Sequence, residues 1–166
     1  MGVLRPAMAS AAGEVADVAV TWSAPGPYIA TTLMPAIARG HGQRHSPGSC
    51  RVVAVVHVAL TGGGRNVAAM VDAATTEHAA SPHYAAMLSR VGVTYDDPAD
   101  RVRSMTECGV VLSGTATEVS ARLAAFADDG VDEVVLNTVG VERVYGRSAA
   151  IDDATEIMSR QDEWSG

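Results

Sequence analysis

The fold is indicated by the stretch GTATEVSARLAAFADDGVDEVVLNT, residues 114–138, which carries the signals of one complete helix-to-strand unit. Thr115 and Glu118 have the T-x-x-E spacing of a capping box, in which each side chain bonds the other residue's free backbone N–H. The apolar residues that follow recur at helical spacing, and they are Val119, Leu123 and Phe126. The stretch therefore predicts a helix that begins at a capped residue and has one apolar face.

The second half of this stretch predicts a strand. Gly130 stands where a left-handed helix C-cap is needed, and Val131 follows as its hydrophobic contact. Residues 134–136 are an unbroken apolar run, typical of a strand buried on both faces in a parallel sheet. Asn137 and Thr138 follow at the carboxyl end of that strand, where α/β proteins place their ligand chemistry.

The rest of the chain repeats this alternation of helix and strand. Strands are predicted at Val18–Trp22, at Arg51–Leu60 and, as a short addition, at Val110–Leu112. Helical patterns are predicted over residues 5–15, 28–37, 67–74, 84–91 and 151–158. The pattern over 151–158 carries Ile151, Ile157 and Met158. Pro35 must kink or split the helix over 28–37. Residues 40–49 and 138–146 are expected to be loops, and 160–166 a frayed tail. The order predicts a parallel α/β fold.

Composition limits the class of protein and of partner. A chain of 166 residues that is 48% hydrophobic and 19% charged is long and apolar enough for one domain, residues 1–166. A net charge of −7 without a basic run argues against a nucleic-acid partner or an anionic membrane surface. No apolar run is long enough to cross a bilayer, so we expect no membrane partner and a cytoplasmic location.

Several kinds of catalytic site are disfavoured. All twelve basic residues are Arg, which excludes a catalytic Lys or a Schiff base. Cys50 and Cys108 lie far apart in the sequence and are interpreted as buried free thiols, ahead of a disulfide or a metal site. His41 and His45 lack a third ligand, so no metal is expected. Three glycines at 62–64 form a turn and not a dinucleotide fingerprint.

Four segments together resemble the bacterial luciferase-like monooxygenases, the flavin- or coenzyme F-420-dependent oxidoreductases with a TIM-type (β/α)8 barrel. The segments are GVLRPAMASAAGEVADVAVTW (2–22), RVVAVVHVAL (51–60), HYAAML (83–88) and GTATEVSARLAAFADDGVDEVVLN (114–137). Their order is similar to that of the C-terminal part of the barrel, with residues 61–109 as its helical insertion. Within the family they look most similar to the actinobacterial branch that uses coenzyme F-420.

The resemblance implies that the first strands of the barrel are missing. Strands one to five would lie before Met1, so the chain would be a truncated form, or one half of a barrel that another chain completes. An open half-barrel exposes a sheet edge and an apolar face, which predicts a homo-oligomer or a complementing chain.

The resemblance also assigns candidate residues for binding. Gly2, Val3, Leu4 and Arg5 would occupy the loop into a helix N-terminus that can hold a cofactor phosphate; the alternative is a ragged end with a surface Arg. Trp22 would lie beside the cofactor ring or simply pack the top of the barrel, and Asn137 would bond a ring edge or cap its strand. The catalytic residues are not assigned.

Three histidines each have a functional and a structural interpretation. His57 and Thr138 are candidates to face a small-molecule substrate, although a buried core histidine is the favoured interpretation of His57. His78 and His83 flank a Ser-Pro pair in the insertion, where substrate-facing groups occur in the family, but surface histidines are the simpler interpretation.

Two functions of different class follow, with a third behind them. The first is an oxidoreductase or monooxygenase that binds coenzyme F-420, or alternatively FMN, and transfers a hydride to a small organic substrate or incorporates oxygen into it. The second is a half-barrel remnant without catalysis that dimerises or pairs with another chain. A flavodoxin-like or Rossmann module is the third, and it lacks the glycine-rich phosphate loop.

Overall fold

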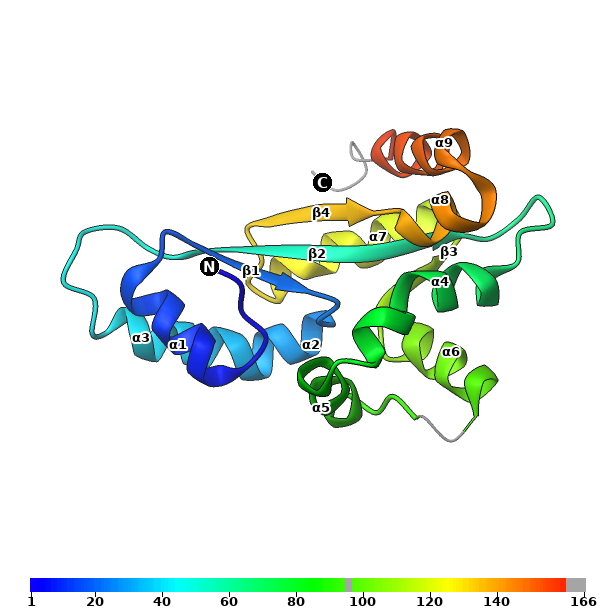
Figure 1. Ribbon diagram of the computed structural model, residues 1–166. Coiled ribbons are helices and arrows are strands. Elements are labelled where there is room, and N and C mark those ends of the chain that lie inside the picture. The colour runs from blue at the N-terminus through cyan, green and yellow to red at the C-terminus, as the bar shows by residue number, and fades with distance from the viewer. Residues whose placement is uncertain (95–96, 161–166) are drawn as a thin grey trace.

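The computed structural model describes residues 1–94 and 97–160, and in this part of the chain four parallel strands form one sheet (Figure 1). The strands are β1 (Val18–Trp22), β2 (Arg51–Leu60), β3 (Val111–Gly114) and β4 (Glu133–Asn137). A parallel α/β fold is therefore confirmed, while its membership of a partial barrel stays a prediction. The expected frayed tail lies outside the described residues from 161 onward.

β2 is the centre of the sheet. Val53 pairs with Val20 of β1 and with Glu133 of β4, so these two strands lie on opposite edges of β2. His57 pairs with both Val111 of β3 and Asn137 of β4, so β3 shares the edge of β1 but lies farther along β2. A single parallel bridge from Gly2 to Val20 continues the sheet beyond β1.

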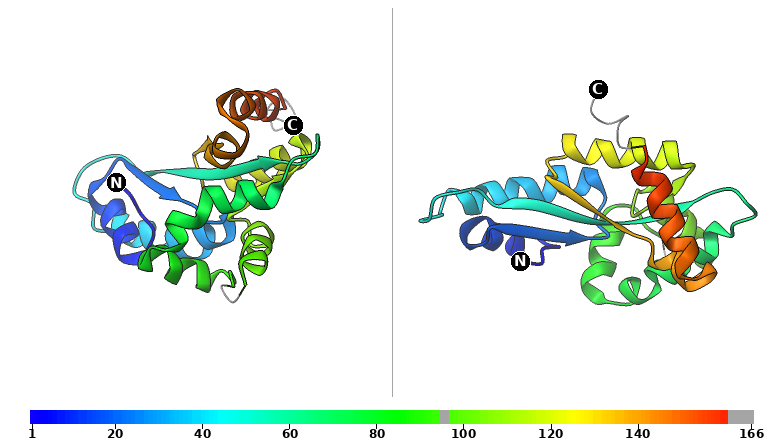
Figure 2. Two further views of the ribbon diagram at one scale, coloured as in Figure 1. Left: turned by 45° about the vertical axis from the view of Figure 1, so that its right-hand side comes forward. Right: turned by 90° about the horizontal axis from the view of Figure 1, so that it is seen from above.

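The helices cover one face of the sheet and surround one of its ends. They are α1 (Pro6–Val15), α2 (Gly26–Tyr28), the π-helix η1 (Ile29–Leu33), α3 (Met34–His41), α4 (Val67–Ala79), α5 (Pro82–Arg90), α6 (Pro98–Glu107), α7 (Ala116–Asp128), α8 (Val139–Tyr145) and α9 (Arg147–Met158). In the view from above, α3 and α7 lie along one side of the strands, and the strands point toward α4 and α8 (Figures 1 and 2). Across residues 1–94 and 97–160, every helix is too short or too polar to pass through a bilayer.

The helix α7 has the termini that its sequence predicts. The Glu118 N–H donates to Thr115 Oγ1 at 3.3 Å, and the Thr115 N–H donates to Glu118 Oε2 at 2.7 Å, which completes the capping box. Gly130 has a positive φ of 87°, and the Val131 N–H donates to the Phe126 carbonyl at 3.0 Å in the closing turn. Local sequence signals alone define both ends of this helix.

The two faces of β2 differ in burial. Val52, Ala54 and Val56 are buried and belong to the main core, together with apolar residues of α3 and α7. Val53 and Val55, which alternate with them, are only half-buried. Because side chains alternate between the two faces of a strand, the helices cover one face and leave the other only partly buried around Val53 and Val55.

The helix α3 reaches its neighbours through a π turn and a glycine contact. Pro35 splits the predicted helix as expected: the Met34 N–H donates to the Ile29 carbonyl, a π-type bond just before the proline. α1 then crosses α3 at Gly13 and Gly40. A Cβ atom added at Gly40 would stand 1.8 Å from the Ser10 carbonyl oxygen, so only glycine permits this approach.

Two sequence expectations about the C-terminal part are wrong. β4 is not buried on both faces: Val135 is 42% exposed, because β4 is an edge strand with β2 as its one partner among the described strands. Residues 139–145 form α8 and not a loop, with Gly140 against the Met70 carbonyl. The helix predicted over 151–158 is present as part of α9, where Ile157 is buried and Ile151 and Met158 are exposed, because only one side of α9 contacts the protein.

Candidate functional site

A cavity of about 430 Å³, called the Trp22 cavity below, lies where β1 ends and the chain enters α1. It is lined by Gly2, Val3, Leu4, Arg5, Met8, Val20, Trp22, Ser81, His83 and Tyr84. Three segments far apart in the sequence meet here: the first residues of the chain, the end of β1, and the start of α5. The structure thus brings Gly2–Arg5 and Trp22 together on one mostly apolar cavity.

The N-terminal segment is held in place by backbone hydrogen bonds. The Val3 N–H donates to the Val20 carbonyl at 2.8 Å, and Val3 is buried. The Tyr28 hydroxyl donates to the Leu4 carbonyl at 2.9 Å. Arg5 is the N-cap residue of α1 and its side chain is exposed, with a guanidinium N–H directed at His83 Nδ1.

Trp22 and His57 are joined by a side-chain hydrogen bond beside this cavity. The Trp22 indole N–H donates to His57 Nε2 at 3.2 Å, and the Trp22 side chain remains 38% exposed. An indole nitrogen can only donate, so this bond requires an unprotonated Nε2 and assigns the proton of a neutral His57 to Nδ1. That Nδ1 atom is buried and has no hydrogen-bond partner among the described residues.

The environment of His57 keeps its imidazole neutral. The side chain is 1% exposed, and burial lowers the His57 pKa from 6.5 to about 4, with smaller electrostatic contributions from the neighbouring His78 and Arg143. His57 therefore offers an N–H and not a positive charge at neutral pH. Its burial agrees with the core interpretation, while the unpaired Nδ1 leaves it capable of donating to a ligand.

His78 joins the same aromatic cluster, contrary to its interpretation as a surface histidine. Its ring stacks on Trp22 at a centroid distance of 5.6 Å and meets the Tyr84 ring edge-on at 5.0 Å. It is half-buried because α4 lies over the carboxyl ends of the strands. The signal was in the sequence: His78 follows Val71 and Thr75 on the buried side of α4. His83, by contrast, is exposed.

Asn137 and Thr138 lie at the end of β4, outside the described lining of the Trp22 cavity. The Asn137 side-chain oxygen accepts the Val139 N–H at 3.0 Å, and the Thr138 carbonyl accepts the Glu142 N–H at 2.9 Å. Both residues therefore help to begin α8. In the register of the sheet, Asn137 of β4 is the partner of His57 of β2.

Other candidate chemistry is sparse in residues 1–94 and 97–160. No three His, Cys, Asp or Glu side chains gather there at metal-binding distance. Cys50 and Cys108 are free and half-buried, and burial raises the pKa of both thiols, so neither is an activated nucleophile.

Comparison with known proteins finds similarity only at the level of structure. No protein-family model matches the chain, and no curated protein sequence matches it. The fold is similar to the coenzyme F-420-dependent tetrahydromethanopterin reductase of Methanopyrus kandleri, with a TM-score of 0.61 and 17% identity over 96% of this chain and 50% of that one. It is also similar to an F-420-dependent secondary alcohol dehydrogenase in complex with an F-420–acetone adduct.

The second match has a TM-score of 0.51 and 14% identity over 90% of this chain and 47% of that one. The chain therefore spans about half the length of both structures. At these identities the likeness is one of fold.

Proposed function

We propose that this chain is the C-terminal part of an oxidoreductase of the luciferase-like (β/α)8 class, and that the Trp22 cavity receives the ring of coenzyme F-420, with FMN as the alternative. The observation that carries the proposal is the meeting of Gly2–Arg5 and Trp22 on one cavity at the carboxyl end of a parallel strand. Ligands of open and closed α/β sheets bind at that end. The F-420-dependent enzymes of similar fold support the choice of cofactor.

The residues of the cavity suit a planar ring with a polar tail. The half-exposed Trp22 offers an aromatic face for stacking, and Leu4 and Met8 add apolar contact. The N-terminus of α1 and Arg5 provide N–H donors and positive charge for a phosphate. A reduced deazaflavin supplies a hydride when bound, and the protein's part is to orient it and exclude water.

The substrate would meet the second set of polar groups near the strand ends. His57 presents a buried Nδ1–H that can donate to a substrate oxygen, once the side chains covering it move aside. Asn137 ends the neighbouring strand β4 and Thr138 follows it. We place Thr138 toward the substrate, and Asn137, which lies outside the Trp22 cavity, toward the edge of a cofactor ring that extends beyond that cavity. A small organic molecule is the expected substrate, and a cytoplasmic location belongs to the same proposal.

The alternative is a half-barrel without catalysis that pairs with a second copy or with another chain. Two observations favour a partner of this kind. β4 is an edge strand among the described strands, with Val135 exposed, and the face of the sheet that carries Val53 and Val55 is only half-buried at these two residues. A second chain that completed the barrel would cover this face. The two functions therefore differ in one observable: the proposed oxidoreductase binds its cofactor, whereas the half-barrel without catalysis binds a partner chain and no cofactor.

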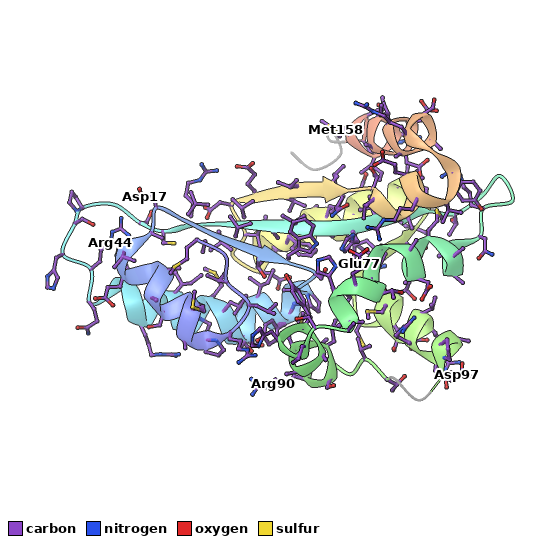
Figure 3. All side chains as sticks on the ribbon, viewed as in Figure 1. Asp17, Arg44, Glu77, Arg90, Asp97 and Met158 are labelled. Atoms are coloured by element: carbon purple, nitrogen blue, oxygen red, sulfur yellow. The ribbon has the colours of Figure 1, made fainter. Side chains whose placement is uncertain are left out.

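A fluorescence titration with coenzyme F-420 and with FMN, run beside light scattering, tests the proposal. We expect a micromolar dissociation constant for one cofactor and a loss of at least about tenfold in Trp22→Ala. Met158→Ala is the matched control, because Met158 is also an exposed apolar side chain but lies on α9, away from the cavity (Figure 3). A folded protein that binds neither cofactor would overturn the oxidoreductase and leave the half-barrel alternative.

A further inference from the structure

A second, smaller cavity of about 140 Å³ adjoins the first. It is lined by Arg5, Tyr28, His83, Ala86, Met87 and Arg90. Arg5 and His83 line both cavities, so the two spaces share one wall. The first cavity is mostly apolar, whereas the second is bordered by two guanidinium groups and an imidazole.

The basic groups come together from two helices. Arg5 is the N-cap of α1, while His83 and Arg90 lie seven residues apart on α5 and therefore on one side of that helix. Arg90 is the last residue of α5 and lines this cavity together with Tyr28 of α2. Both guanidinium groups act on the same phenol: burial raises the pKa of Tyr28, and the charges of Arg90 and Arg5 oppose that rise.

These two arginines differ from most others in the chain. Arg44, Arg51, Arg65, Arg101, Arg103 and Arg143 each have a carboxylate within 4.0 Å. In the described part of the chain, neither Arg5 nor Arg90 has a carboxylate at that distance. Two like charges therefore border one small cavity with no carboxylate of the described residues within 4.0 Å of either, in a chain whose net charge is −7.

We infer that Arg5, His83 and Arg90 form an anion-binding site for a phosphate or carboxylate group of a ligand whose apolar part occupies the Trp22 cavity. Each guanidinium has five N–H donors, and the contact of Arg5 with His83 uses one of them, so donors remain for an oxyanion. This inference rests on the proposed function, because both use Arg5 and the Trp22 cavity. It adds helix α5, which belongs to the segment 61–109, to the binding site.

Phosphate alone is the first probe, because it requires no cofactor ring. We expect saturable binding of inorganic phosphate or pyrophosphate by calorimetry, weakened about tenfold in Arg90→Gln. Arg39→Gln is the matched control: it removes the same charge from an exposed position on α3, and it should bind as the wild type does. Equal binding by Arg90→Gln and the wild type, or the absence of saturable binding, would overturn the site.

A second arm uses a short dicarboxylate such as glutarate. Arg90-dependent binding of phosphate but not glutarate assigns a phosphoryl group, and Arg90-dependent binding of glutarate supports a carboxylate. The experiments distinguish a failure of the anion-binding site from a failure of the proposed oxidoreductase. Phosphate binding that depends on Arg90, in a protein that binds neither F-420 nor FMN, would retain the anion site and remove the oxidoreductase. Because Arg90 is exposed, the variant should keep the wild-type thermal transition, which circular dichroism checks.

Discussion

The two faces of β2 are made of similar residues and meet different surroundings. Val52, Ala54 and Val56 on one face are buried under helices, whereas Val53 and Val55 on the other are half-exposed. The covered face belongs to a close-packed core. The open face runs toward the Trp22–His57 pair, since Trp22 is the register partner of Val55 and His57 continues the alternation. The comparison separates the residues that hold the fold together from those available to a ligand or a partner.

The largest expected effect tests the covered side at the crossing of α1 and α3. Gly40→Ala should lower the free energy of unfolding by roughly 3 kcal/mol or more, because its Cβ would overlap the Ser10 carbonyl and force the helices apart. Gly42→Ala is the control on the same helix end, where the nearest atom would lie at 3.4 Å and no clash arises. Urea denaturation measures both, and equal effects would contradict a close-packed crossing.

The next effect is a pH dependence of stability caused by His57, which lies on the same face of β2 as Val53 and Val55 but is buried. His57 has a folded-state pKa of about 4 against 6.5 when exposed, so the unfolded chain binds more protons between these values. The stabilisation is complete above pH 6.5 and is lost as the pH falls to about 4, by roughly 3 kcal/mol in total.

Denaturant unfolding across this pH range measures the slope, with His57→Gln as the variant that cannot titrate. The difference between the two pH profiles isolates His57 from the carboxylates. A wild-type slope identical to that of His57→Gln would mean that the imidazole is not shielded from water.

The smallest of the three effects compares neighbours on opposite faces of the same strand. Val56→Ala should lower the free energy of unfolding by roughly 2 kcal/mol, because two buried methyl groups leave a void under the helices. Val55→Ala should cost less than about 1 kcal/mol, since water already reaches this side chain. Equal losses would show that a partner covers the open face in solution, and light scattering would then report an assembly larger than one chain.

Much of the fold could be predicted from the sequence where the signals are local. The capping box of α7, the glycine turn at Gly130 and the proline effect at Pro35 each depend on a few adjacent residues, and each is present. The exposure of Val135 depends instead on how many strands the sheet has, which an apolar run does not encode. The helix at 139–145 depends on packing of Gly140 against α4, a contact distant in sequence.

The candidate site divides in the same way. The meeting of Gly2–Arg5 with Trp22 was expected from the family resemblance, and a parallel bridge from Gly2 to Val20 brings the two segments together in the structure. The positions of His78 and Arg90 beside these cavities could not be predicted from the sequence as a whole, because tertiary packing determines how the helices of 61–109 return over the strands. For His78 the spacing on α4 carried a usable signal; for Arg90 no local pattern distinguishes it from a solvated charge.

The π turn over Ile29–Leu33 has a consequence for how the length of this chain can vary. A π turn takes one more residue than an α turn, so the helices on either side keep the relation of a regular helix that is one residue shorter. A homologue that lacks one residue here and has no proline at the position of Pro35 would keep Ala36 and Ile37 buried. The natural place for a single-residue gap in an alignment is thus inside a helix, and not in the loops that join helices to strands.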